Sequence, residues 1–162
     1  MKNNKSLGQH WLKNRAILDE IADMAAEGSA WQTSDITEVE RQKQLSAAEV
    51  ASKAGTVVEI GPGLGTLTSS LLKRFEKVIA VEYDARLAEN LPKSFPGKNL
   101  VVVNADILQY DFSKIAGKYV VAGNIPYYIT SPIIEKLISL DNAPQRIVLL
   151  IQKEVAERIV AE

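Results

Sequence analysis

One short segment combines residue types that can do chemistry on an aromatic amine. Residues 123 to 130 read GNIPYYIT and follow the apolar run KYVVA. The Asn124 side-chain oxygen and the Ile125 carbonyl can accept hydrogen bonds from such an amine. Preorganised acceptors of this kind help the nitrogen become tetrahedral and nucleophilic toward a methyl group. Tyr127 can stack on a flat base, which is worth on the order of 1 to 3 kcal/mol. The alternative is a turn, stiffened by Pro126, with a tyrosine in the core.

A glycine-rich loop follows the first buried run, TVVEI. The loop reads GPGLGT and has glycines at 61, 63 and 65. Glycines let the backbone turn tightly and approach a ligand, and a helix beginning near Leu64 would point its N-terminus at the same spot. A dinucleotide fingerprint would read G-x-G-x-x-G, but Thr66 stands three residues after Gly63. The spacing therefore argues against a pyrophosphate cradle.

Two acidic residues follow the next two apolar runs. Glu82 lies about 20 positions after Gly61, where a carboxylate can accept hydrogen bonds from both hydroxyls of a ribose. Asp106, in NADIL, can accept from the exocyclic amine of adenine, although a helix cap or turn residue is the alternative. Together with the glycine loop, these acids describe a pocket for adenosine without a second phosphate-linked nucleotide. S-adenosylmethionine fits that description.

Alternating strands and helices must position these residues. We expect five strands, rich in Val and Ile and covered on both faces, at residues 56–60, 77–82, 100–104, 119–124 and 146–151. Apolar residues three or four apart predict crossover helices within residues 64–75, 84–91 and 131–140, after a first helix at 16–27. This pattern predicts an α/β fold, a Rossmann-like, doubly wound and mostly parallel sheet. The segment NIPY then follows strand four at the ligand-binding edge, which favours catalytic roles for Asn124 and Tyr127 over a plain turn.

Composition restricts the kinds of site that the chain can build. The 162 residues are 46% hydrophobic, about the size of one domain, and 19 Lys and Arg against 20 Asp and Glu give a net charge of -1. No overall basic field would hold a nucleic acid through phosphate contacts alone. The sequence has no Cys and one His, so we expect no disulfide, no cysteine nucleophile and no metal site. Without a run of roughly 18 apolar residues or a secretory signal, we expect a soluble, cytoplasmic monomer.

The chain divides into a basic N-terminal arm, residues 1–15, and one domain, residues 16–162. A solvated tail is the default interpretation of the arm. Residues 28–54 form a polar connection to which we assign no function.

Six sequence blocks, in order and spanning nearly the whole chain, resemble the ribosomal RNA adenine N6,N6-dimethyltransferases, which are KsgA-like and related to the Erm resistance methyltransferases. The blocks are KSLGQHWL, VVEIGPGLGTLT, AVEYD, NADIL, GNIPYYITSPII and LIQKEVAERIVA. The resemblance implies an S-adenosylmethionine site at which His10 and Leu12 of the arm close over the cofactor. It also implies that the loop containing Gly61 and Gly63 binds the cofactor, with Gly61 against its methionine part. Glu82 would bind the ribose and Asp106 the adenine, while Asn124 would contact both the cofactor and the target amine.

The resemblance further implies dimethylation of adenosines in RNA of the small ribosomal subunit, in ribosome biogenesis. An Erm-like enzyme acting on large-subunit RNA, a non-catalytic RNA-binding or assembly factor on the same fold, and a nicotinamide oxidoreductase are the alternatives. Thr66 argues against the last. Relatives continue with two further strands and a basic helical domain, so we expect the N-terminal catalytic part of a longer protein or a truncated product. Its sheet would stop after strand five and leave that strand as an exposed edge.

Overall fold

The computed structural model describes residues 15–26 and 54–151. Within them a single five-stranded sheet has the order β3-β2-β1-β4-β5, and every neighbouring pair is parallel. The strands are β1 (Ala54–Ile60), β2 (Phe75–Glu82), β3 (Leu100–Asn104), β4 (Tyr119–Asn124) and β5 (Arg146–Leu150). The α-helices are α1 (Arg15–Ala26), α3 (Thr66–Arg74), α4 (Ala85–Asn90) and α5 (Thr130–Ile138). In the described ranges there are also three 3-10 helices: η2 (Leu91–Ser94), η3 (Phe112–Lys114) and η4 (Tyr127–Ile129).

This architecture confirms the predicted α/β class, and the boundaries differ from the predicted ones by small amounts. The first helix begins and ends one residue earlier than expected. The helix after the glycine loop begins at Thr66 instead of near Leu64, because Gly65 has a φ of 87° in the left-handed region and cannot continue a right-handed helix. The arm up to residue 14 and the polar connection up to residue 53 lie outside the described residues.

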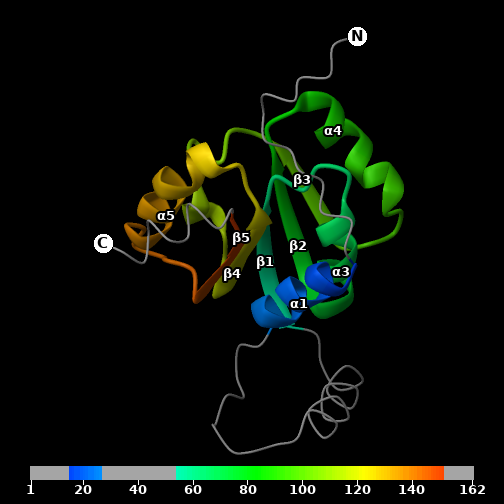
Figure 1. The fold of residues 1–162 in the computed structure, drawn as a ribbon, viewed down its shortest axis with the longest axis horizontal. Coiled ribbons are helices and arrows are strands. Elements are labelled where there is room, and N and C mark those ends of the chain that lie inside the picture. Colours follow the sequence, from blue (N-terminus) through cyan, green and yellow to red (C-terminus); the bar gives the residue numbers. More distant parts are fainter. Residues whose placement is uncertain (1–14, 27–53, 152–162) are drawn as a thin grey trace, which may run out of the picture.

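Helices cover both faces of the sheet (Figure 1). Successive strand residues point to opposite faces. Val57 therefore belongs to the apolar cluster that includes Leu71 of α3, with α1 on the same face. The next residue, Val58, belongs to the cluster that includes Ile133 of α5. Each face of the sheet thus has its own core.

The expected burial on both faces holds for the central strands and is wrong for the outer ones. The last four residues of β1 are buried, as are five of the six in β4. In β3, by contrast, Val101 is 42% exposed, and all five residues of β5 are only half-buried. These two strands end the strand order among the described residues, so each has one sheet neighbour there. A Val- and Ile-rich run indicates a parallel strand but does not by itself distinguish a central strand from an edge strand.

The carboxyl ends of β1 and β4 meet at the point where the strand order reverses. The chain runs from β1 through α3 to β2, which lies on one side of β1, whereas β4 lies on the other side of β1. Ile60 pairs with Gly123 at this point. A Cβ on Gly123 would lie 2.8 Å from the Ile60 carbonyl oxygen, closer than real Cβ contacts allow. Glycine at 123 therefore lets the two strand ends approach and sets the position of Asn124 beside the glycine loop.

We expect Gly123→Ala to lower the free energy of unfolding by roughly 1 to 3 kcal/mol, because the new methyl group must push apart two strands of the central sheet. Urea denaturation measures this loss. Gly55→Ala is the matched control in the neighbouring strand: nothing lies within 4 Å of its Cβ position, so its stability should change little or rise slightly. Equal losses in the two variants would contradict the close-approach argument.

Candidate active site

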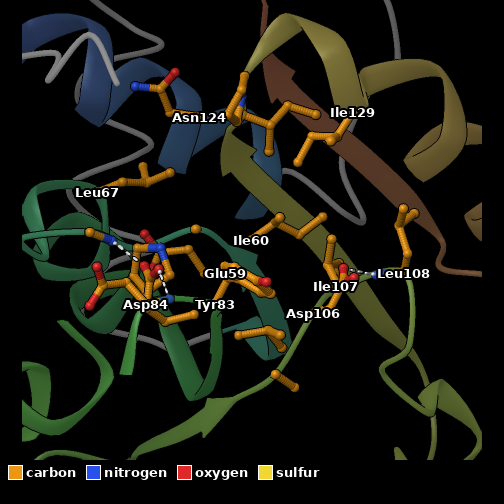
Figure 2. A pocket seen from close by; sticks show the side chains of 18 of the residues that line it. Glu59, Ile60, Leu67, Tyr83, Asp84, Asp106, Ile107, Leu108, Asn124 and Ile129 are labelled. Atoms are coloured by element: carbon orange, nitrogen blue, oxygen red, sulfur yellow. Dashed lines mark hydrogen bonds between the residues drawn. The ribbon is translucent and has the colours of Figure 1, made fainter. Parts of the chain in front are cut away.

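A cavity of about 610 Å³ lies outside the carboxyl ends of β1 to β4. This is the edge at which open α/β sheets bind their ligands, and the size suits a nucleoside-sized molecule. Figure 2 shows side chains from the ends of these strands gathered around it. Five of the predicted site residues line the cavity: Gly61, Gly63, Glu82, Asp106 and Asn124. His10 and Leu12 lie outside the described residues, as does the side chain of Tyr127, whose backbone lies in η4.

The Glu82 carboxylate holds two segments of the cavity wall. It is 5% exposed, and its two oxygens accept different backbone N–H groups: Oε2 that of Gly63 and Oε1 that of Asp84, each at 3.0 Å. Each carboxylate oxygen has a second lone pair for a ligand hydroxyl. Glu82 therefore combines a structural role with the capacity to accept hydrogen bonds in the cavity, and an alanine there would remove both.

Asn104 extends the same network to the third strand. Its Nδ2 donates to the carbonyls of Glu82 and Tyr83, at 2.9 and 3.0 Å. The Ala105 N–H also donates to the Glu82 carbonyl. These bonds fix the turn after β2 and leave the Tyr83 side chain 78% exposed at the cavity. The walls formed by β1, β2 and β3 are thus joined by hydrogen bonds.

Asp106 begins a tight turn after β3. Its Oδ1 accepts the Leu108 N–H at 2.9 Å, and its carbonyl accepts the N–H groups of Gln109 and Tyr110. The turn-residue interpretation is therefore correct for one carboxylate oxygen. The other oxygen, Oδ2, has no hydrogen bond with any residue of the described ranges. Because Asp106 lines the cavity, a ligand donor can be bound there.

The segment GNIPYYIT also forms a turn. The Pro126 carbonyl accepts hydrogen bonds from the Ile129 N–H at 3.3 Å and the Thr130 hydroxyl at 3.2 Å. Asn124 is half-buried at the end of β4, and Tyr128 is 50% exposed on the cavity wall. The turn geometry accounts for the proline and places Asn124 in the same cavity as Glu82 and Asp106.

Sequence reasoning missed a buried acid, Glu59, although a charged residue inside the apolar run TVVEI was a visible signal. Glu59 is 1% exposed, lines the cavity and accepts the hydroxyl of Thr68 in α3 at 2.5 Å. Burial raises its pKa from 4.5 to about 8, helped by the nearby Glu82 and opposed by the bond from Thr68. The side chain is therefore predominantly a neutral acid at pH 7, tying the strand end to the helix that follows the glycine loop.

Residues 15–26 and 54–151 lack the features of two other kinds of site. No helix there has the length and apolar character to cross a membrane. Nor do three or more acidic or histidine side chains gather there in a group that could hold a metal ion.

The parallel sheet, the glycine loop and the acids after β2 and β3 together define the Rossmann-like fold of the class I S-adenosylmethionine-dependent methyltransferases. The family model for ribosomal RNA adenine dimethylase matches residues 1–162. The chain belongs to this family.

Proteins that are similar in sequence or in structure support this family assignment. The ribosomal RNA small subunit methyltransferase A of Dehalococcoides mccartyi (strain CBDB1) is 36% identical over 100% of this chain and 49% of its own length. A dimethyladenosine transferase from Plasmodium falciparum has a TM-score of 0.67 at 36% identity, covering 94% of this chain and 47% of that one. The 23S rRNA methyltransferase ErmE has a TM-score of 0.66 at 29% identity, covering 90% and 49%. The chain spans about half the length of the curated relatives that it matches.

We expect the Glu59→Gln variant to gain stability relative to wild type as the pH rises. In wild type the folded acid keeps its proton up to about pH 8, whereas the unfolded one loses it near 4.5, so the free energy of unfolding falls between these values. Glutamine removes this pH dependence while keeping an acceptor for Thr68. The stability difference between variant and wild type should grow by on the order of 3 to 5 kcal/mol from pH 4.5 to 8.

Urea denaturation of both proteins at several pH values measures this difference. Glu76→Gln, an exposed glutamate in β2, should show no such trend. A constant difference between Glu59→Gln and wild type across this range would contradict a buried neutral acid.

Proposed function

We propose that this chain carries the S-adenosylmethionine and target-adenosine sites of an enzyme that dimethylates the exocyclic amine of adenosines in small-subunit ribosomal RNA, in ribosome biogenesis. Family membership supports this activity, and so do relatives named ribosomal RNA small subunit methyltransferase A. The observation that carries the proposal is the meeting of Asn124 with Glu82 and Asp106 around one cavity.

The charge of the cavity supports S-adenosylmethionine over a dinucleotide. Besides the neutral acid Glu59, its wall contains three carboxyl side chains and one arginine: Glu82, Asp84, Asp106 and Arg86. Such a wall suits a ligand with a sulfonium and an ammonium group and disfavours a pyrophosphate. When bound, S-adenosylmethionine supplies an electrophilic methyl group.

The residues that would hold this cofactor are those whose acceptors face the cavity. Glu82 would bind the ribose hydroxyls with its remaining lone pairs, and Asp106 Oδ2 would accept from the adenine amine. Gly61 and Gly63 would leave room for the methionine part. His10 and Leu12 remain predicted lid residues.

The target amine would be bound by the GNIPYYIT segment. In this proposal the Asn124 side-chain oxygen and the Ile125 carbonyl accept its hydrogens, which offsets the delocalisation of the nitrogen lone pair into the ring. Tyr127 would stack on the extruded base. This chemistry requires no strong base at the site. The ribosomal RNA partner, the monomeric state and the cytoplasmic location remain proposals.

We expect Asp106→Asn to weaken S-adenosylmethionine binding by roughly 10-fold, because an amide replaces the carboxylate oxygen that would accept from the adenine amine. The amide oxygen can still accept the Leu108 N–H, so the melting temperature should hold. Isothermal titration calorimetry measures the affinity. Asp111→Asn is the matched control, since Asp111 also accepts a backbone N–H two residues on but lies outside the cavity wall. Tight NAD binding without S-adenosylmethionine binding would overturn the proposal.

We expect Asn124→Ala to reduce methyl transfer by roughly 100- to 1,000-fold, since it removes one preorganised acceptor. Transfer of radiolabelled methyl groups to immature small ribosomal subunits and to 23S RNA measures the activity, with Asn90→Ala on an exposed helix end as the control. The assay is run on this chain and on a chain extended with the C-terminal half of a relative. Labelling of 23S RNA alone would favour the Erm-like alternative, and no labelling by either chain would reject an enzyme.

A further inference from the structure

Lys136 makes an unusual set of hydrogen bonds beside the candidate site. It lies on α5, the helix that directly follows the GNIPYYIT turn. Its Nζ donates to three backbone carbonyls of one loop: Ile107 at 3.0 Å, Leu108 at 2.8 Å and Tyr110 at 2.7 Å. A lysine ammonium has three N–H donors, so this loop occupies all of them.

The surroundings hold the Lys136 ammonium in a partly dehydrated place beside an aromatic ring. Nζ lies 5.4 Å from the centre of the Phe112 ring, within range of a cation–π contact. Burial lowers the pKa of Lys136, while the carboxylates of Asp106 and Asp111 act against that shift. An ordinary surface lysine keeps its head group in water. Here the side chain is instead held in one conformation by its hydrogen bonds to main-chain oxygens, which indicates a specific structural role.

The loop that Lys136 holds is the turn that Asp106 begins. Asp106 accepts the Leu108 N–H with its side chain and the Tyr110 N–H with its carbonyl. The N–H groups of the turn thus point to Asp106, and its carbonyls point to Lys136. Anchoring these carbonyls fixes the orientation of the turn and hence of the Asp106 carboxylate.

Helix α5 is in turn attached to the segment that contains Asn124, because the Thr130 hydroxyl at its start donates to the Pro126 carbonyl. We propose that Lys136 is a positioning residue that holds the Asp106 turn against α5 and so sets where the adenine-binding carboxylate lies relative to the Asn124 segment. The proposal rests on the function proposed above. It assigns selectivity for the adenine amine to a side chain that does not line the cavity.

Substitution by methionine tests this role, since methionine keeps the apolar stem and removes all three donors. The probes are S-adenosylhomocysteine and S-inosylhomocysteine, which differ in whether the purine presents an amine or a carbonyl oxygen. Wild type should prefer the adenine compound by on the order of 100-fold, because an acceptor in the cavity wall discriminates against a ligand that lacks the donor.

We expect Lys136→Met to reduce this preference by roughly 10-fold, as measured by calorimetry with both probes. Lys114→Met removes a nearby exposed charge for which no hydrogen bond is present among the described residues, and it should leave the preference unchanged. If Lys136→Met does not fold, Lys136→Gln, which retains two N–H donors, replaces it in the same comparison.

A double variant separates positioning from general stability. With Asp106→Asn already present, Lys136→Met should cause no further loss of preference, because the two residues act through one contact. A preference that is unchanged in Lys136→Met, or that falls again by the same factor in the double variant, overturns the role of Lys136 and leaves the proposed function standing. Failure of wild type to bind either probe overturns the proposed function itself.

Discussion

The paired hydrogen bonds of the Glu82 carboxylate are the interaction on which the candidate site depends. One side chain at the end of β2 binds the glycine loop that follows β1 and the turn that leads into α4. Loops at the edge of a parallel sheet have no strand neighbours to fix them, and their buried N–H groups need acceptors. Because the carboxylate satisfies both N–H groups from a buried position, the loop conformations follow from the strand register. The positions of Glu82, Asp106 and Asn124 therefore follow from the positions of the strands that end beside them.

A second constraint concerns the accumulation of acids at this edge. Two buried carboxyl groups, Glu59 and Glu82, come from adjacent strands and point toward the same region. Such a pair is costly when both members are charged. Burial, with a smaller contribution from the nearby Glu82, raises the pKa of Glu59 to about 8, so Glu59 stays predominantly neutral at pH 7 and this cost is avoided. The Thr68 hydroxyl then links the strand to α3, and the remaining charges give the cavity its acidic character.

Sequence patterns were sufficient for the sheet and for five residues of the cavity wall. Runs of Val and Ile located all five strands, and the ends of those strands located Gly61, Glu82, Asp106 and Asn124. The contacts of Glu59 and Lys136 could not be found in this way. The partner of Glu59 is on a helix face nine residues away, and Lys136 reaches carbonyls 26 to 29 residues earlier in the chain. Such pairs depend on how the helices lie over the sheet. The roles of His10, Leu12 and Tyr127 stay predictions.

The hydrogen bonds of Asn104 have a consequence for the thermodynamics of ligand binding. Together with Glu82 they cross-link the walls from three strands through hydrogen bonds within the protein itself. A ligand that enters such a cavity does not have to order these walls, so it avoids the loss of conformational entropy that a loose loop would impose. Association should then be limited by diffusion and entry more than by rearrangement of this part of the protein. Slow steps in a catalytic cycle would arise in other segments.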